Sequence, residues 1–161
     1  MKRTQSYRSF RKLGRRTPTP EITNKTEQLC SGKHLKFIDE AQMCAERSVL
    51  RTKHGSVLVK NGKIISVGYN RFHTDSLVFD SKLLNSRRTC TRVTRHAEED
   101  ALRNCDTRLM NGAILYVIRI GYDLPGNPIY MQSMPCERCT ACIKHCMDKY
   151  GLKAVYYTVG K

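Results

Sequence analysis

Apolar and polar residues recur along the chain with two different periods, which predicts a succession of helices and strands. Residues 34–51 (HLKFIDEAQMCAERSVLR) carry one face at helical spacing, made of Leu35, Ile38, Gln42, Ala45 and Val49, with Gln42 its one polar member. This pattern predicts a helix. Gly55 follows it as a stop signal.

The segment 56–71 (SVLVKNGKIISVGYNR) predicts a β-hairpin. Two runs rich in β-branched residues flank Asn61-Gly62, and Asn-Gly supplies the positive φ angles of a tight turn. We expect antiparallel strands near 56–60 and 63–69. Residues 71–95 lack clean periodicity and predict a long loop, with a short helix around 77–84.

The second half of the chain predicts further helices and strands in alternation. A helix is expected from His96 to about residue 105, a strand at 113–120, a helix after Pro135 and a last strand at 152–159. The turn-rich stretch GYDLPGNP lies between the strand and the helix, and IYMQS after it could return as a short strand. Alternating strands and helices predict an α/β sandwich around one sheet.

The domain organisation follows from length and composition. With 161 residues, 40% of them hydrophobic, the chain can bury one core. We assign residues 1–28 to a basic flexible tail and 29–161 to the folded domain. The longest apolar run, AILYVI at 113–118, is strand-sized, so no membrane span is expected.

The charge is strongly positive, at +15, with 29 basic against 14 acidic residues. Residues 1–25 contribute +7 of this, so the rest of the chain is basic too. A nucleic acid or a nucleotide phosphate is the expected polyanionic partner, against the alternative of a solvated surface without a specific ligand.

The expected compartment is intracellular and reducing. The tail is rich in Arg, Ser and Thr and nearly free of acids, which fits a mitochondrial transit peptide and equally a disordered nucleic-acid-binding arm. Eight cysteines without a signal peptide favour metal binding over disulfides. Cytoplasm or nucleus is therefore expected, or the mitochondrion if the tail is a transit peptide.

The run MPCERCTACIKHC, residues 134–146, places four cysteines together and raises two metal hypotheses. Cys136, Cys139, Cys142 and Cys146 match the ferredoxin spacing C-x2-C-x2-C-x3-C. However, Met147 stands where a proline is usual, and no second run exists. Cys142 and Cys146 also suit buried positions on a helix.

The second hypothesis combines this run with RHAEED upstream. His96-Ala97-Glu98 and Pro135-Cys136-x-x-Cys139 form the pair H-x-E and P-C-x-x-C that marks zinc deaminases. Zinc with three protein ligands, His96, Cys136 and Cys139, keeps one position open for water. Glu98 would shuttle the proton while the activated water attacks the amine-bearing ring carbon and ammonia leaves.

On these motifs, and on GSVLVKNGKIISVGYN, the chain resembles the cytidine deaminase superfamily, in its CMP/dCMP deaminase-like branch, over about residues 34–158. The resemblance implies a three-layer α/β/α sandwich with a mixed sheet of four to five strands and one catalytic Zn2+. It implies that Asn70, in Gly68-Tyr69-Asn70, binds the nucleoside. Two departures are an insertion, GYDLPGNPIY, and the lack of the family's last helix and strand, which a partner could complete.

Three substrates remain open within this resemblance. The first is a free nucleotide, CMP or dCMP, its phosphate bound by the loop arginines Arg87, Arg88, Arg92 or Arg95. The second is cytosine in single-stranded DNA or RNA, favoured by the basic charge. The third is tRNA adenosine, disfavoured because Met134 stands where such relatives often carry Glu.

Two further alternatives stay open. The fold could serve as a non-catalytic RNA- or DNA-binding subunit of a larger assembly, although the presence of Glu98 argues against that. A second metal could use His73, Cys90 or Cys105, or Cys142 and Cys146.

Overall fold

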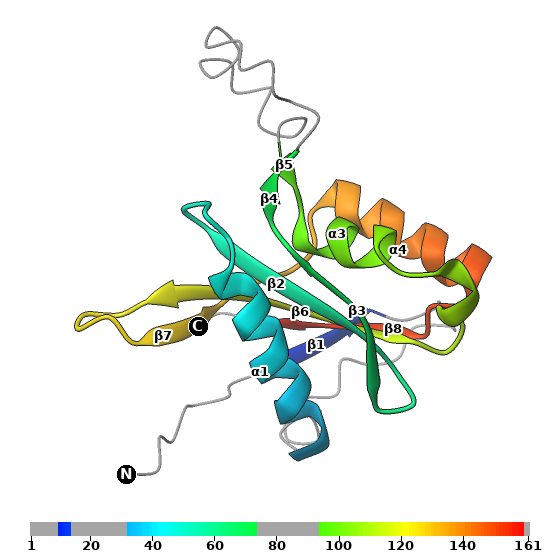
Figure 1. The fold of residues 1–161 in the computed structure, drawn as a ribbon, viewed down its shortest axis with the longest axis horizontal. Coiled ribbons are helices and arrows are strands. Elements are labelled where there is room, and N and C mark those ends of the chain that lie inside the picture. Colours follow the sequence, from blue (N-terminus) through cyan, green and yellow to red (C-terminus); the bar gives the residue numbers. More distant parts are fainter. Residues whose placement is uncertain (1–9, 14–31, 74–93, 160–161) are drawn as a thin grey trace, which may run out of the picture.

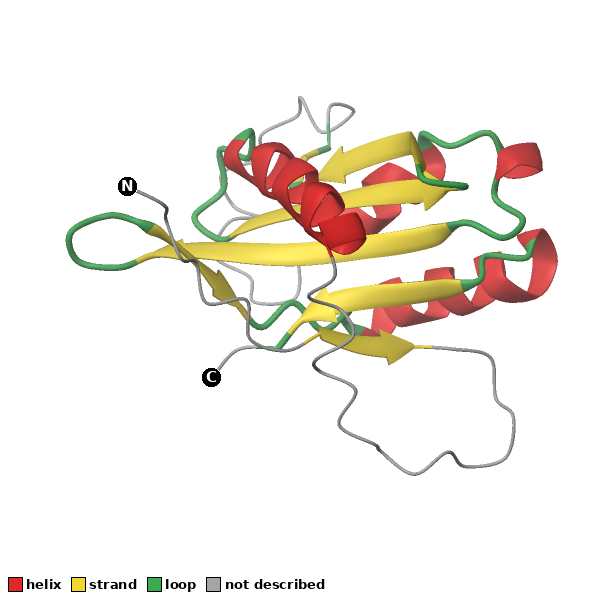
Figure 2. Ribbon diagram, turned by 90° about the horizontal axis from the view of Figure 1, so that it is seen from below, coloured by secondary structure: helices red, strands yellow, loops and turns green. Residues whose placement is uncertain are grey.

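The computed structural model describes residues 10–13, 32–73 and 94–159, with the side chains of 34–73 and 94–159. Its centre is a mixed sheet in the order β1-β8-β6-β2-β3, with β7 paired to β6. Helix α1 covers one face, and α3 and α4 cover the other (Figures 1 and 2). This confirms the three-layer α/β/α prediction. The elements and their bounds are β1 Phe10–Leu13, α1 Gly32–Glu46, β2 Lys53–Lys60, β3 Lys63–Tyr69, β4 Arg71–Phe72, β5 Thr94–Arg95, α3 Ala97–Arg103, the 3-10 turn η2 Thr107–Leu109, β6 Ile114–Tyr122, β7 Pro128–Met131, α4 Glu137–Tyr150 and β8 Ala154–Thr158.

Alternation along the strands builds two separate cores, one on each face of the sheet. On β2, Val57 and Val59 pack against α1, whereas Leu58 packs against α3 and α4. On β6, Tyr116 joins the α1 core and Val117 the other. Because successive side chains of a strand point to opposite faces, each strand serves both cores.

The β2–β3 hairpin confirms the turn prediction. Asn61 and Gly62 have positive φ angles of 50° and 75°, and the strands pair antiparallel with Gly55 opposite Tyr69. Strand β6 pairs antiparallel with β2 and parallel with β8, which makes the sheet mixed.

The first helix ends earlier than predicted, and Gly55 is not its stop signal. Helix α1 ends at Glu46, and Val49 lies outside it with 80% of its surface exposed. Gly55 lies within β2, where a Cβ atom would overlap the backbone of Ala41 and Ala45 in α1. The glycine is needed because the helix lies so close to the strand.

The segment before the P-C-x-x-C motif forms the short strand suggested by IYMQS. Strand β7 pairs antiparallel with β6, with Met131 opposite Arg119. The insertion is therefore an extension of the sheet by a hairpin, whose turn contains Gly126 at φ 104°.

Four residues of the segment assigned to the tail form strand β1 instead. Phe10–Leu13 pairs antiparallel with β8, which lies beside β6 on its other side. The backbone groups along this side of β8 are thereby hydrogen-bonded, and the sheet gains its sixth strand. The partner invoked to complete the sheet is not required at β8. The short helix expected at 77–84 lies outside the described residues.

No helix in the described part of the chain is both long and apolar enough to cross a membrane.

Candidate zinc site

The predicted metal ligands come together where α3 and α4 begin. His96 is the N-cap residue of α3, and Cys136 is the N-cap residue of α4, with Cys139 one turn further. The His96 Nδ1 atom lies 3.5 Å from the Cys136 sulfur and 3.3 Å from the Cys139 sulfur. Among the described residues, these three alone form a group that could hold a metal ion, with ligand atoms within 4.8 Å of one another.

The spacing of these atoms fits zinc. Tetrahedral bonds of about 2.0–2.3 Å place neighbouring ligand atoms about 3.5 Å apart, close to the two distances found. Burial, and then the charge of Arg138, lower the pKa of His96, which favours the neutral imidazole that metals bind. Both cysteines lie at the start of α4, and burial raises the pKa of the Cys139 thiol, so its deprotonation would accompany metal binding. The donor set therefore suits zinc with one position left open.

The segment between β7 and α4 positions the two cysteines. The Ser133 hydroxyl donates a hydrogen bond to the Val117 carbonyl of β6 at 2.9 Å, and its Oγ accepts one from the Thr158 N–H of β8 at 2.8 Å. This anchors the chain two residues before Pro135. At the other end of α4, Gly151 takes the left-handed conformation that closes a helix, with φ 75°.

Glu98 lies inside the site rather than on its surface. It is 5% exposed, in the first turn of α3. Burial raises the pKa of Glu98, and a hydrogen bond with the Cys139 thiol opposes the rise. The carboxylate that the sequence proposed for proton transfer is thus next to a metal ligand.

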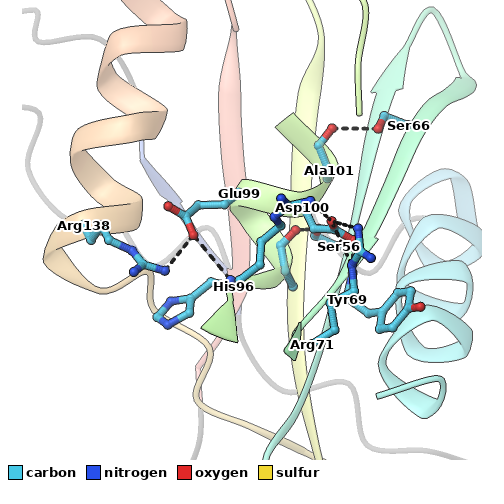
Figure 3. A network of polar contacts seen from close by, with 11 residues as sticks. Ser56, Ser66, Tyr69, Arg71, His96, Glu99, Asp100, Ala101 and Arg138 are labelled. Carbon is cyan, nitrogen blue, oxygen red and sulfur yellow. Dashed lines mark hydrogen bonds and ion pairs between the residues drawn. The ribbon is translucent and has the colours of Figure 1, made fainter. Parts of the chain in front are cut away.

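The other two acids of that turn are bound by arginines (Figure 3). Glu99 Oε2 forms an ion pair with Arg138 of α4 at 2.6 Å and accepts a hydrogen bond from the His96 N–H at 3.4 Å. This ties the two ligand-bearing helices together. Arg138 lies between Cys136 and Cys139 in the sequence. Its positive charge is the one sequence feature that could have indicated an ion pair with an acid of α3.

Asp100 forms the second internal charge cluster. Its side chain is 2% exposed and forms ion pairs with Arg71 at 2.8 Å and with Arg95 at 3.4 Å. Arg95 was predicted to bind a phosphate, and the structure places its side chain against Asp100. Arg87, Arg88 and Arg92, together with Cys90, lie outside the described residues.

Asn70 is buried where β3 ends. Its Nδ2 donates to the Thr52 carbonyl at 2.6 Å, and its Oδ1 accepts from the His54 N–H at 2.8 Å. The side chain therefore fastens the end of β3 to the start of β2. Its contact with a nucleoside stays a prediction.

The other two cysteines of α4 point elsewhere. Cys146 belongs to the core beneath α3 and α4, together with Cys105, and Cys142 packs against that core. Neither joins the group formed by His96, Cys136 and Cys139. The described residues thus offer no four-cysteine cluster.

Comparisons with known proteins agree with this site. The family description "Cytidine and deoxycytidylate deaminase zinc-binding region" matches residues 31–158. The chain therefore belongs to this family of zinc-binding deaminases.

One solved structure shows the fold at low sequence identity, and two others are similar to a lesser degree. The apo dCMP deaminase of cyanophage S-TIM5 superposes with a TM-score of 0.51 and 22% identity, over 79% of this chain and 82% of that chain. The same enzyme in complex with dCMP and dUMP gives a TM-score of 0.48 and 19% identity, over 79% and 81%. Acinetobacter baumannii RibD, form 1, gives a TM-score of 0.35 and 21% identity, over 53% and 19%. No curated protein matches the chain.

Proposed function

We propose that this chain is a hydrolase that deaminates the cytosine of a nucleotide, dCMP or CMP, with Glu98 as the residue that moves the proton. The observation that carries the proposal is that Glu98 is buried beside a predicted zinc ligand and is not held in an ion pair by any described residue. Glu99 and Asp100 are held by arginines, whereas Glu98 forms no ion pair within the described residues and lies beside Cys139. A non-catalytic binding module would have no use for a buried carboxylate at this position.

The proposed reaction adds water to the ring and releases ammonia. When bound by His96, Cys136 and Cys139, zinc supplies the Lewis acidity that lowers the pKa of a water molecule. The Glu98 carboxylate accepts a proton from the attacking water and delivers it to the ring nitrogen next to the amine-bearing carbon. It then carries the second proton to the departing amine, so that cytosine and water become uracil and ammonia.

The remaining charges of the site hold this geometry. The Glu99–Arg138 ion pair joins α3 to α4, and Asp100 joins α3 to Arg71 and Arg95. Pairs that are partly shielded from water resist screening by salt. We infer that they keep His96 and the two cysteines at the spacing that zinc requires.

The substrate assignment rests on the family and is tested with a panel. Zinc-loaded protein is incubated with dCMP, CMP, deoxycytidine, cytidine, a single-stranded DNA, a single-stranded RNA and tRNA, and each product is measured by mass spectrometry. dCMP comes first because the cyanophage protein with this fold is a dCMP deaminase. We expect conversion of the cytosine nucleotides.

The Glu98→Gln variant tests the role of the carboxylate. It removes the proton carrier at nearly constant shape, so turnover should fall by about 10²- to 10⁴-fold while zinc remains bound. Glu46→Gln, at the exposed end of α1, is the matched control and should keep full turnover. Undiminished turnover by Glu98→Gln, or no conversion of any substrate by zinc-loaded wild type, would contradict the proposed function.

A further inference from the structure

The sheet extends beyond the two helix ends that carry the metal ligands. The Ser56 hydroxyl of β2 donates to the carbonyl of Ala97, the first residue of α3, at 2.7 Å. The Ser133 hydroxyl donates to Val117 of β6 at 2.9 Å, shortly before Cys136. Ser56 and Val117 are register partners. The N-terminal ends of α3 and α4 therefore both lie near the paired residues Ser56 and Val117 of the sheet.

The next residues outward on the same face are His54 and Arg119. They are direct register partners on β2 and β6. Since side chains alternate, both share the face of Ser56 and Val117, which is the face covered by α3 and α4. His54 and Arg119 therefore lie side by side just beyond the N-terminal ends of the ligand-bearing helices.

Electrostatics support this placement. Burial, followed by the positive charge of Arg119, lowers the pKa of His54 to about 4, with a smaller contribution from the neighbouring His96 ring. His54 is thus close to both Arg119 and a metal ligand, and it is neutral at pH 7. A neutral ring adds no further positive charge next to the guanidinium.

Arg119 differs from the other arginines described near the zinc site, because it forms no ion pair with any described residue. Its Nε is buried and has no hydrogen-bond partner, which is also true of the Arg95 Nε, but no carboxylate of the described residues forms an ion pair with Arg119. In contrast, Arg71, Arg95 and Arg138 are all paired with acids of α3. A half-buried cation without a partner is costly, so the position favours an anionic ligand.

The inserted hairpin fixes Arg119 in place. Arg119 is flanked by His54 of β2 on one side and by Met131 of β7 on the other. A side chain on a central strand loses less freedom on binding than one on a loop, which improves its affinity for a ligand.

We propose that Arg119 binds the substrate's phosphate at the mouth of the zinc site, with His54 beside it. The proposal rests on the proposed function, because a cytosine at the zinc ligands would extend its sugar and phosphate outward over this part of the sheet. A guanidinium can bind phosphate through two parallel hydrogen bonds. The phosphate could be the terminal group of a free nucleotide or a phosphodiester of a single strand.

Binding is measured first, by titration calorimetry of dCMP into zinc-loaded Glu98→Gln protein. Adding Arg119→Ala should weaken dCMP binding by about 10- to 100-fold, the loss expected for charge-assisted hydrogen bonds. Arg119→Lys keeps the charge but loses the planar fork, so a several-fold loss is expected. It also carries the test if the alanine variant does not fold. Arg108→Ala is the control, because Arg108 is 88% exposed at η2 and pairs with Asp106.

Turnover by protein with an intact Glu98 then distinguishes the contribution of the phosphate from that of the rest of the substrate. Arg119→Ala should lower kcat/KM for dCMP and leave deoxycytidine, which has no phosphate, unchanged. An equal loss for both compounds, or no loss of dCMP binding, would overturn the assignment while the proposed function stands. Absence of turnover by the wild type would overturn the proposed function, and the calorimetry would still decide on Arg119.

A short single-stranded oligonucleotide identifies the source of the phosphate. Loss of oligonucleotide turnover in Arg119→Ala, with dCMP turned over poorly by the wild type, would assign the phosphodiester. Loss confined to dCMP would assign the free nucleotide. Oligonucleotide and dCMP turnover both unaffected would contradict the proposal.

Discussion

Helix α4 carries two pairs of cysteines, and the difference between them shows how position on one helix decides chemistry. The ligand pair, Cys136 and Cys139, lies at the N-terminal turn and faces His96. The core pair, Cys142 and Cys146, lies further along and packs with Cys105 and Ile143. Spacing alone made the four look like one cluster. The deciding fact is that His96 reaches only the first turn.

The largest expected effect comes from replacing a member of each pair by serine. Cys139→Ser should abolish zinc binding and turnover together, because a neutral hydroxyl is a poor substitute for a thiolate. Cys142→Ser is the matched variant and should keep one zinc ion per chain. Metal content is measured by mass spectrometry of the purified proteins. Zinc lost equally from both variants, or iron found in the wild type, would show that the four cysteines act as one site.

A smaller effect is expected on stability, and here substitution in the core pair should cost more than substitution in the ligand pair. Cys146 is 5% exposed in an apolar core, so Cys146→Ser buries a hydroxyl there and should lower the free energy of unfolding by about 1–3 kcal/mol. Cys136→Ser, at an exposed position, should cost less in the zinc-free protein. Urea titrations of both zinc-free variants compare them. A larger loss for Cys136→Ser would mean that the first turn is also a folding element.

The smallest effect concerns the reactivity of the core pair. A hydrogen bond from the Cys146 thiol lowers the pKa of Cys142 to about 7, so its thiolate becomes abundant as pH rises through neutrality. Alkylation of Cys142 in zinc-loaded protein should therefore rise with a midpoint near pH 7 and level off about one pH unit above that midpoint. In Cys146→Ala the pKa of Cys142 returns upward, and the rate at pH 7 should fall about tenfold. Mass spectrometry of the modified peptide gives both profiles, and identical profiles would exclude the hydrogen bond.

Local patterns predicted much of the fold and the metal site. The turn at Asn61-Gly62 was predictable because these two residue types readily adopt the positive φ angles that it requires. The metal site was predictable because both motifs lie at the starts of helices, where His96 meets the two cysteines. Asn70 was found by the resemblance alone, and its visible contacts are with the backbone of residues 52 and 54.

Features that depend on distant partners escaped prediction. Strand β1 has no alternating pattern in FRKL and exists because it pairs with β8, more than a hundred residues later. The sequence predicts a helix stop at Gly55, because the close approach of this residue to Ala41 exists only once β2 packs on α1. Arg119 had no motif around it. Its significance comes from His54 on the neighbouring strand and from the absence of an ion pair to Arg119 among the described residues.

The most direct test of the account is X-ray absorption at the zinc edge of the purified protein, because it counts the ligand atoms. If His96, Cys136 and Cys139 hold the metal, the spectrum shows two sulfur ligands at about 2.3 Å, with one nitrogen and one oxygen at about 2.0–2.1 Å. The nitrogen belongs to His96, and the oxygen to a water molecule at the open position. Four sulfur ligands and no nitrogen would contradict this ligand set, since Cys142 and Cys146 would then be ligands and no position would be free for chemistry.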